Sequence, residues 1–182
     1  MGHECQRTGF TLIELLLAAA IALVVFGAGL NLLLGEARQG NQLAQGLLLR
    51  RLQRRTLRLV RDDLRSARSW EVAPEASADW PCPLSGRQPL LAIRLSQDTP
   101  AVLYSLGKAP SPIWVGPVLM RCGPAFDLQG RPSSEGQYQN RVVLDAIHQF
   151  RVEQPTALPV LDLMLEQRIE GTDQLVRSSA VG

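Results

Sequence analysis

Residues 15–35 form a stretch of 21 residues without a charged side chain, and this stretch constrains the fold more than any other feature. At a rise of 1.5 Å per residue, a helix of this length spans about 30 Å, the thickness of the hydrocarbon core of a bilayer. Gly27 and Gly29 weaken a helix in water, but membrane helices tolerate glycine. The sequence therefore predicts a transmembrane helix near the N-terminus.

Charge is distributed unevenly along the rest of the chain. Residues 36–70 hold nine arginines against three acidic residues, whereas residues 71–182 hold nine basic residues against twelve acidic ones. An apolar content of 46% excludes a disordered chain, and three cysteines are too few for a disulfide-dense scaffold. A length of 182 residues suits one compact domain with an extension.

The start of the apolar stretch raises two questions. A cleavable secretory signal is an alternative to a membrane anchor, but here the strongly apolar sequence continues through residues 21–34, beyond a cleavage site near Ala20. Glu14 places a carboxylate at the mouth of the apolar helix, which costs free energy in lipid. This side chain either reaches the water of the headgroup region or has a partner within the membrane.

The residues that lead into the apolar stretch form a specific motif. Residues 9–17 read Gly-Phe-Thr-Leu-Ile-Glu-Leu-Leu-Leu. This segment resembles the type IV prepilin signal, in which a short polar leader ends in glycine before Phe-Thr-Leu-Ile-Glu and an apolar helix. The resemblance implies that a membrane prepilin peptidase cuts between Gly9 and Phe10 and then N-methylates Phe10. It also implies that Glu14 neutralises the Phe10 amine of a neighbouring subunit during filament assembly.

The implied role of Glu14 has a physical basis and implies a topology. An ammonium and a carboxylate are each costly in lipid, whereas a pair formed between two subunits offsets both costs. The N-terminus would then lie in the cytoplasm, and the residues after the apolar helix would lie outside the bacterial inner membrane. Other pilins would bind the chain through its N-terminal helix, and it would become part of a pilus or pseudopilus. The positive-inside rule opposes this orientation, because Arg38, Arg50 and Arg51 follow the apolar stretch. We give the motif precedence.

Residues 36–70 lack proline and are rich in leucine, arginine and glutamine, which predicts a helix. On a helical wheel the apolar residues fill one half and the arginines fill the other. The apolar face either docks on the C-terminal domain or lies on a membrane surface or partner, and a third interpretation is nucleic-acid binding by the arginines. The first is favoured, because an amphipathic helix ordinarily packs its apolar face on the domain and leaves its charged face in water. The third is weakened, because no aromatic residues are interleaved with the arginines to stack on bases.

The remaining residues predict a β-rich domain. Residues 71–89 contain four prolines and indicate a loop. Five or six short strands are expected after it, over residues 90–96, 101–106, 118–122, 140–153, 160–169 and 174–181. The first two of these segments, and the last two, are expected to form hairpins. Together with the long helix, they predict an α+β fold with an antiparallel sheet.

This order of elements resembles the minor pilins and pseudopilins of the J and W types. The shared features are an arginine-rich helix at Leu52–Ala67, a strand ending in Leu119-Met120-Arg121 and an apolar pattern over Val143–Val152. Secretion, DNA uptake, adhesion and motility all remain open as the process that the filament serves. The resemblance divides the chain into a leader, a transmembrane half-helix, an amphipathic half-helix and a β-rich domain, at residues 1–9, 10–35, 36–70 and 71–182.

Removal of the leader takes away Cys5 and leaves Cys82 and Cys122 in an extracytoplasmic domain. An even pair in that compartment favours a disulfide, which would close a loop of about 40 residues and stabilise the fold by roughly 3–4 kcal/mol. Two unrelated free thiols are the alternative. Cys82 lies between two prolines in an expected loop, where a free thiol is exposed to oxidation.

Patterns typical of enzymes are missing from the sequence. His3 and His148 are the only histidines, and neither a zinc-ligand set nor a nucleophile triad can be built around His148. Gly27-Ala-Gly29 lies in the apolar stretch and is not a nucleotide-binding fingerprint. We therefore expect no catalytic residue, metal or cofactor. The alternative to a pilin is an unprocessed single-span binding module anchored in the membrane.

Overall fold

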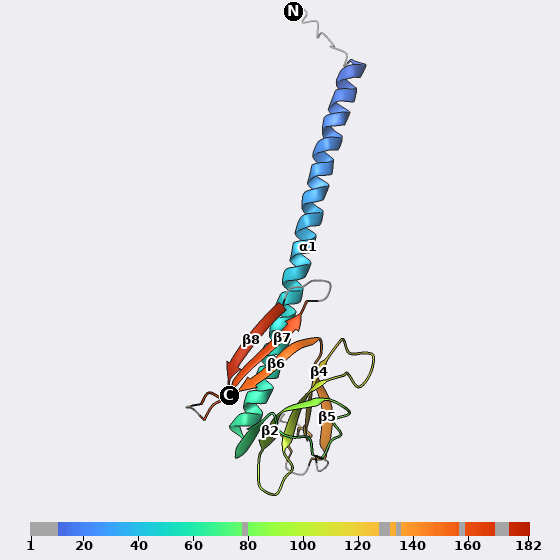
Figure 1. Cartoon of the computed structure of the whole chain (residues 1–182). Helices are drawn as coiled ribbons and strands as arrows, with labels where there is room; N and C mark the ends of the chain where they lie inside the picture. Colours follow the sequence, from blue (N-terminus) through green and yellow to red (C-terminus); the bar gives the residue numbers. More distant parts are fainter. Residues whose placement is uncertain (1–10, 78–79, 128–131, 134–135, 157–158, 170–174) are drawn as a thin grey trace, which may run out of the picture. The chain divides into compact units, whose positions relative to one another are not determined.

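The computed structural model describes residues 11–77, 80–127, 132–133, 136–156, 159–169 and 175–182, and their side chains except those of residues 32–39 and 41–42. The described residues form one helix and eight strands (Figure 1). The chain divides into two compact units, Met1–Ala44 and Gln45–Gly182. Helix α1 (Leu12–Arg65) begins in the first unit and ends in the second.

In the first unit, α1 contains the stretch that the sequence predicts to cross a membrane. The segment Leu12–Asn31 is long and apolar enough to span a bilayer, and none of it is buried within the molecule. A helix that is apolar on all sides needs an apolar environment around it. That environment must therefore come from lipid or from other chains.

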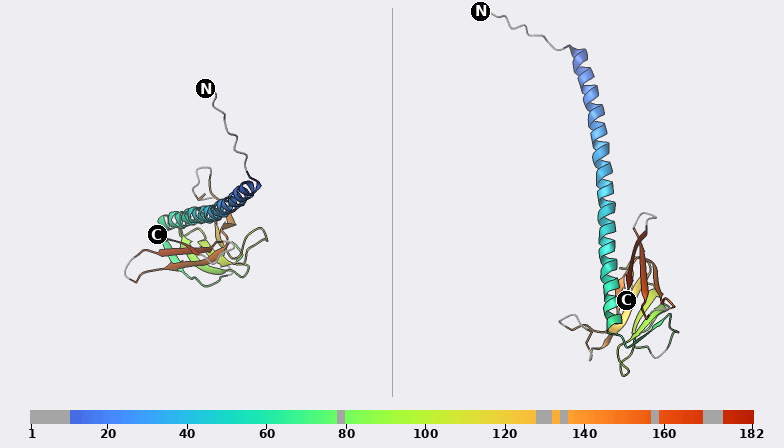
Figure 2. Two further views of the ribbon diagram at one scale, coloured as in Figure 1. Left: turned by 90° about the horizontal axis from the view of Figure 1, so that it is seen from above. Right: turned by 90° about the vertical axis from the view of Figure 1, so that its left-hand side faces the viewer.

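The second unit holds two antiparallel sheets that lie against the C-terminal part of α1 (Figures 1 and 2). The five strands of the first sheet follow one another in chain order: β1 (Ser69–Val72), β2 (Gln88–Arg94), β3 (Val102–Gly107), β4 (Val118–Pro124) and β5 (Tyr138–Leu144). The second sheet also keeps chain order: β6 (Ile147–Glu153), β7 (Asp162–Arg168) and β8 (Leu175–Val181). The α+β fold and the two predicted hairpins, β2–β3 and β7–β8, are confirmed, but the strands form two sheets rather than one.

The core of the second unit lies between α1 and both sheets. Leu57, Val60 and Leu64 of α1 are buried. They join a cluster of side chains from the two sheets and from the segment before β7: Leu91, Ile93, Val102, Tyr104, Leu119, Leu144, Ile147, Phe150, Leu161, Leu163 and Leu165. Docking of the amphipathic helix is thus confirmed for its last three turns. Leu48 and Leu52, which the wheel places on the same face, remain 57% and 37% exposed.

Strand alternation divides the first sheet into two faces. The register pairs Tyr104 with Arg121 and Leu103 with Cys122. Tyr104 and Arg121 point toward α1 and contact it, whereas Leu103 and Cys122 belong to a second apolar cluster. Strand β4 is buried over its whole length. The first sheet is therefore covered on both faces at β4.

The helix ends at Arg65 rather than at residue 70, where the sequence predicts its end. The amide of Arg68 donates to the carbonyl of Arg94 at 2.8 Å, and β1 pairs with β2 from the next residue onward. Aromatic and β-branched residues favour strands, and β1 contains Trp70 and Val72. Pairing with β2 thus overrides the helical pattern in the last few residues.

One predicted strand, residues 140–153, is two strands in different sheets. Strand β5 ends at Leu144 and β6 begins at Ile147, with Ala146 between them at a φ of 51°. The amide of Ala146 donates to the carbonyl of Val115 at 2.6 Å, which holds the turn. The sequence contains the signal, because Leu144 and Ile147 are three residues apart and a continuous strand alternates with a period of two.

Candidate functional site

Helix α1 begins with a reciprocal cap between Thr11 and Glu14. The amide and hydroxyl of Thr11 donate to Glu14 Oε2 at 3.0 and 2.9 Å, and the Glu14 amide donates to Thr11 Oγ1 at 3.4 Å. Such a capping box satisfies N-terminal amides that have no partner within the helix. The Glu14 carboxylate also lies at the helix end where the macrodipole favours negative charge.

The cap uses only part of the Glu14 carboxylate. Both Thr11 donors bind Oε2, and among the described residues no donor reaches Oε1. Cleavage between Gly9 and Phe10 would leave the cap intact, because the Thr11 amide belongs to the peptide bond that follows Phe10. Glu14 can therefore cap its own helix and accept a further hydrogen bond at the same time.

Sequence reasoning missed Thr11, although the sequence contains its signal. A Thr-x-x-Glu pattern directly before an apolar run is the signature of a capping box. The two other residues predicted to act at this end, Gly9 and Phe10, lie outside the described residues.

The apolar surface around Glu14 is uncovered. Leu12, Ile13 and Leu15 retain 76%, 75% and 66% of their accessible surface. Gly27 and Gly29 have no atom within 4 Å of the position that a Cβ would occupy. An exposed apolar surface of this kind marks a contact with a membrane or another protein, and small residues allow close helix packing.

The basic face of α1 in the second unit lies in solvent. The exposed arginines of α1 are Arg50, Arg51, Arg54, Arg55, Arg58 and Arg65, and Arg61 is half-buried. Arg68, which follows the helix, is exposed as well. Arg65 pairs with Asp62 at 3.5 Å, a surface ion pair of little energetic weight. Within the part of the chain that the structure describes, the other seven arginines form no ion pair. This face therefore carries a local positive potential.

A buried polar cluster joins α1 to the first sheet. Asp63 is 2% exposed, and its Oδ2 accepts hydrogen bonds from the Tyr104 hydroxyl at 2.6 Å and from Arg121 Nε at 2.7 Å. Its Oδ1 accepts one from Arg121 Nη2 at 3.0 Å. Arg121 Nη1 donates to the Pro124 carbonyl at 3.4 Å, and the guanidinium lies 4.7 Å from the centre of the Phe126 ring. The buried charges are therefore paired in bidentate geometry.

Burial and charge shift the protonation equilibria of this cluster. Burial raises the pKa of Tyr104 well above its usual value, and the negative charge of Asp63 raises it further. Burial lowers the pKa of Arg121, but the hydrogen bonds and charge of Asp63 outweigh that effect, so its pKa rises. Since Tyr104, Asp63 and Arg121 are all buried, the cluster fixes α1 on the sheet and faces no solvent-filled site.

The sequence indicates that Asp63 is a buried carboxylate, but it does not indicate its partners. Asp63 lies three residues after Val60 and directly before Leu64, so it falls on the apolar half of the wheel, where a carboxylate needs a partner. Its partners are 41 and 58 residues away along the chain and come from β3 and β4. Only the tertiary structure brings them to it.

Cys82 and Cys122 form a disulfide, with their Cα atoms 6.0 Å apart. Both residues are buried in the second apolar cluster, on the face of the first sheet that points away from α1. The bond ties the proline-rich segment before β2 to strand β4. Its formation in the cell stays a prediction.

His148 is an exposed residue of β6. Among the described residues, no group of three His, Cys, Asp or Glu side chains is placed to hold a metal ion. The features that stand out are therefore surfaces and pairings: the capped N-terminus of α1, its uncovered apolar side chains and its basic face.

Comparison with known proteins identifies the N-terminal segment. Residues 6–30 match the family described as the prokaryotic N-terminal methylation motif. The match includes Gly9, Phe10 and Glu14, and it supports a type IV pilin-like protein that is anchored in a membrane. The resemblance inferred from residues 9–17 is confirmed at the level of this motif. No curated protein and no solved structure matches the chain.

Proposed function

We propose that the chain is a minor type IV pilin or a type II secretion pseudopilin of the J or W type. Prepilin peptidase cuts it between Gly9 and Phe10 and N-methylates Phe10, and the mature subunit joins a filament. The main support is a single carboxylate, Glu14, at the start of an exposed apolar helix within the matched motif. The proposal includes anchoring in the inner membrane with residues 36–182 on the extracytoplasmic side.

The cap of α1 suggests how Glu14 can serve assembly. Cleavage creates an ammonium at Phe10, one residue before Thr11, beside an apolar helix. Glu14 Oε2 is occupied by Thr11, and Oε1 has capacity for a second donor. An ammonium and a carboxylate in lipid are costly apart and favourable together. If the amine comes from a neighbouring subunit, this pair makes one helix register preferable to others.

The role of Glu14 is tested by Glu14→Leu, with crosslinking to other pilins and cleavage scored in the same membranes. The variant helix is more apolar, so insertion and cleavage continue, whereas crosslinking is lost because the incoming amine has no partner. Glu14→Asp gives an intermediate yield, since the charge stays and the side chain is one methylene shorter. Thr11→Ala is the matched control, because it removes the hydroxyl contacts of the cap and keeps the carboxylate. Full crosslinking by Glu14→Leu would limit Glu14 to helix capping.

Processing is tested at Gly9, which has no side chain to obstruct the active site of the peptidase. Gly9→Val should accumulate as a membrane-held precursor that keeps the nine-residue leader. Gly27→Val, within the span but distant from the cut in sequence, should mature normally. Normal maturation of Gly9→Val would remove the cleavage assignment.

One observation favours the alternative, a single-span binding module that is never processed. The exposed arginines of α1 lie after the apolar span, where the positive-inside rule predicts the cytoplasmic side. Protease added to intact spheroplasts separates the two topologies. It digests the domain at residues 45–182 in the proposed orientation and spares it in the reverse one.

A further inference from the structure

The Arg87 side chain is buried at the edge of a pocket, and no acidic side chain in the described part of the chain is paired with it. It is 6% exposed, its Nη2 donates to the Pro83 carbonyl at 2.9 Å, and its Nε has no hydrogen-bond partner among the described residues. Arginine is rarely buried unless it is paired, because an uncompensated charge in the interior is costly. Arg121 in the same sheet shows the ordinary solution, since Asp63 binds it with both oxygens.

The backbone makes room for Arg87 on two sides. Ser85 and Gly86 have φ angles of 50° and 79°, and the Arg87 amide donates to the Leu84 carbonyl at 3.0 Å. This tight turn with two left-handed residues directs the chain back into β2. Across from it, an added Cβ at Gly107 would lie 3.0 Å from Arg87 Cγ. The fold thus accommodates a charged side chain that it does not neutralise.

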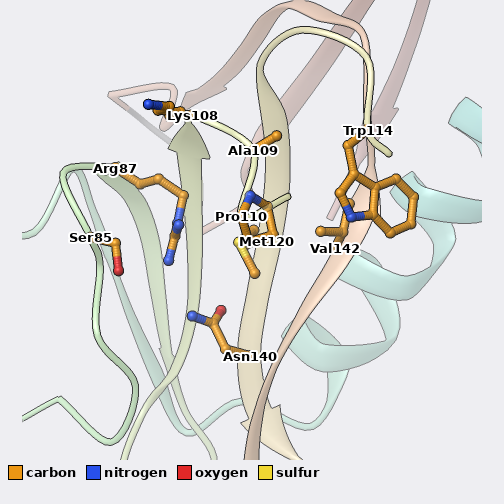
Figure 3. Close-up of a pocket in the computed structure, with 9 residues that line it drawn as sticks. All are labelled: Ser85, Arg87, Lys108, Ala109, Pro110, Trp114, Met120, Asn140 and Val142. Atoms are coloured by element: carbon orange, nitrogen blue, oxygen red, sulfur yellow. The ribbon is translucent and has the colours of Figure 1, made fainter. Parts of the chain in front are cut away.

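Arg87 lines a pocket of about 620 Å³, a size typical of small-molecule sites (Figure 3). Lys108 supplies a second cation, Ser85 and Asn140 supply polar groups, and Trp114 and Met120 supply apolar surface. None of the nine described residues that line it is acidic. The pocket is therefore positively charged on one side and apolar on the other.

The polar side of the pocket is held by the disulfide. Arg87 Nη2 and Asn140 Nδ2 both donate to the Pro83 carbonyl, at 2.9 and 3.2 Å, so the two side chains converge there. Figure 3 shows the guanidinium turned toward Asn140. Pro83 follows Cys82, and the disulfide joins Cys82 to Cys122, which is paired with Asn140 across β4 and β5. The donors are thus positioned before any ligand arrives.

Burial lowers the pKa of Arg87, because no neighbouring anion offsets the loss of hydration. A bound anion would reverse that penalty, since a charge-assisted pair is strongest where water is excluded. An anion that pairs with Arg87 therefore gains binding free energy from a charge that the fold has already removed from water.

We propose that this pocket binds a carboxylate attached to a compact apolar group. The planar guanidinium of Arg87 matches a carboxylate, Lys108 adds charge at the rim, and Trp114 contacts the apolar part. Phosphate fits less well, because the lining strands and loops include no helix N-terminus to supply further donors. This inference is independent of the proposed filament function.

The test is an NMR titration of the full chain in detergent micelles, with arginine labelled by ¹⁵N. The Nε–Hε signal of Arg87 is identified by its absence in Arg87→Gln. Benzoate should shift this signal saturably, and benzamide, which has the same shape and no charge, should not. Inorganic phosphate should bind at least about tenfold more weakly than benzoate. N-acetyl-aspartate amide represents a carboxylate within a peptide, and its affinity relative to benzoate distinguishes a peptide ligand from a free organic acid.

Equilibrium dialysis with radiolabelled benzoate provides the variant series. Arg87→Met should lose at least about tenfold in affinity, and Lys108→Gln should lose less because its side chain is exposed. Arg94→Gln is the matched control, since Arg94 is an exposed arginine at the other end of β2, and its affinity should equal that of the parent chain.

Thermal stability separates a binding role from a structural one. Arg87→Met removes an unpaired buried charge, so its melting temperature should equal or exceed that of the parent chain without ligand. The proposal is overturned if benzoate and the peptide carboxylate both fail to shift the Arg87 signal. It is also overturned if phosphate binds more tightly, or if Arg87→Met binds benzoate as well as Arg94→Gln does.

Discussion

Two carboxylates on the same helix, Glu14 and Asp63, are stabilised in opposite ways. Glu14 is exposed, and its partner Thr11 is three residues away in sequence. Asp63 is buried, and its partners Tyr104 and Arg121 come from strands far along the chain. The apolar residues differ in the same way, because those around Glu14 are uncovered and those around Asp63 pack in the core.

This difference shows which part of α1 finds its packing and charge partners within one chain. The second unit covers its part of the helix with two sheets and neutralises the buried charge internally. The first unit leaves an apolar surface and half of a carboxylate without partners among the described residues. Lipid and neighbouring subunits are the partners that our proposal assigns to it. Variants that act on one carboxylate should therefore leave the other region unaffected.

The largest expected effect is at Asp63. Asp63→Ala leaves the Arg121 guanidinium buried without its counter-ion, which should reduce the free energy of unfolding by about 3–5 kcal/mol. Denaturant titration of the chain in detergent micelles, followed by tryptophan fluorescence, measures the loss. Asp62→Ala is the control, because Asp62 is exposed and its pair with Arg65 should contribute less than about 1 kcal/mol. Equal losses for both variants would mean that the buried cluster does not fix α1.

The disulfide should have the next largest effect. Cys82→Ser with Cys122→Ser opens a loop of about 40 residues and should cost roughly 3–4 kcal/mol. Thiol alkylation with non-reducing electrophoresis tests the bond in the parent chain, where both cysteines should stay protected until reductant is added. Free labelling of both in intact cells would contradict the pairing, and it would strengthen the case for a cytoplasmic domain.

Tyr104→Phe should have a smaller effect that depends on pH. Loss of a hydrogen bond to a charged group should cost about 1.5–3 kcal/mol near neutral pH. The folded chain holds the Tyr104 proton more tightly than the unfolded chain, so this contribution is complete below the ordinary tyrosine pKa of 10.0 and declines at higher pH. Denaturant titrations from pH 8 to 11 should show a weaker alkaline decline in Tyr104→Phe. If the stability of Tyr104→Phe declines with pH as steeply as that of the parent chain, groups other than Tyr104 cause the alkaline decline.

The smallest effect is expected at Thr11. Thr11→Ala removes the hydroxyl that donates to Glu14 Oε2 and accepts from the Glu14 amide, and this loss should destabilise the first turn of α1 by about 1 kcal/mol. Amide hydrogen exchange in micelles should become faster near residue 14 and stay unchanged around Asp63. Faster exchange at both places would show that the two regions are coupled rather than independent.

Local patterns in the sequence predict much of this fold. The uncharged stretch, the amphipathic half of α1, most strands and both hairpins follow from composition and periodicity. The errors occur where tertiary contacts decide: the end of α1 depends on pairing of Arg68 with Arg94, and the break at Ala146 depends on the hydrogen bond that its amide donates to the Val115 carbonyl.

The sites divide along the same line. The role of Glu14 is predictable because its motif is contiguous, and the Thr-x-x-Glu pattern predicts the capping role of Thr11 equally well. The Arg121 partner of Asp63 could not be inferred, because nothing in a single sequence relates residues 58 positions apart. The pocket at Arg87 was also beyond reach, since it depends on a turn, a glycine and a disulfide that meet only in the folded chain.

Cleavage and methylation are tested most directly by the N-terminus of the chain extracted from the membrane. Mass spectrometry of the N-terminal peptide determines both the cut and the methyl group in one measurement. The proposed processing predicts a peptide that begins at N-methylated Phe10. A membrane form that begins at Met1, in cells that process other prepilins, would contradict it and leave the unprocessed binding module as the better description.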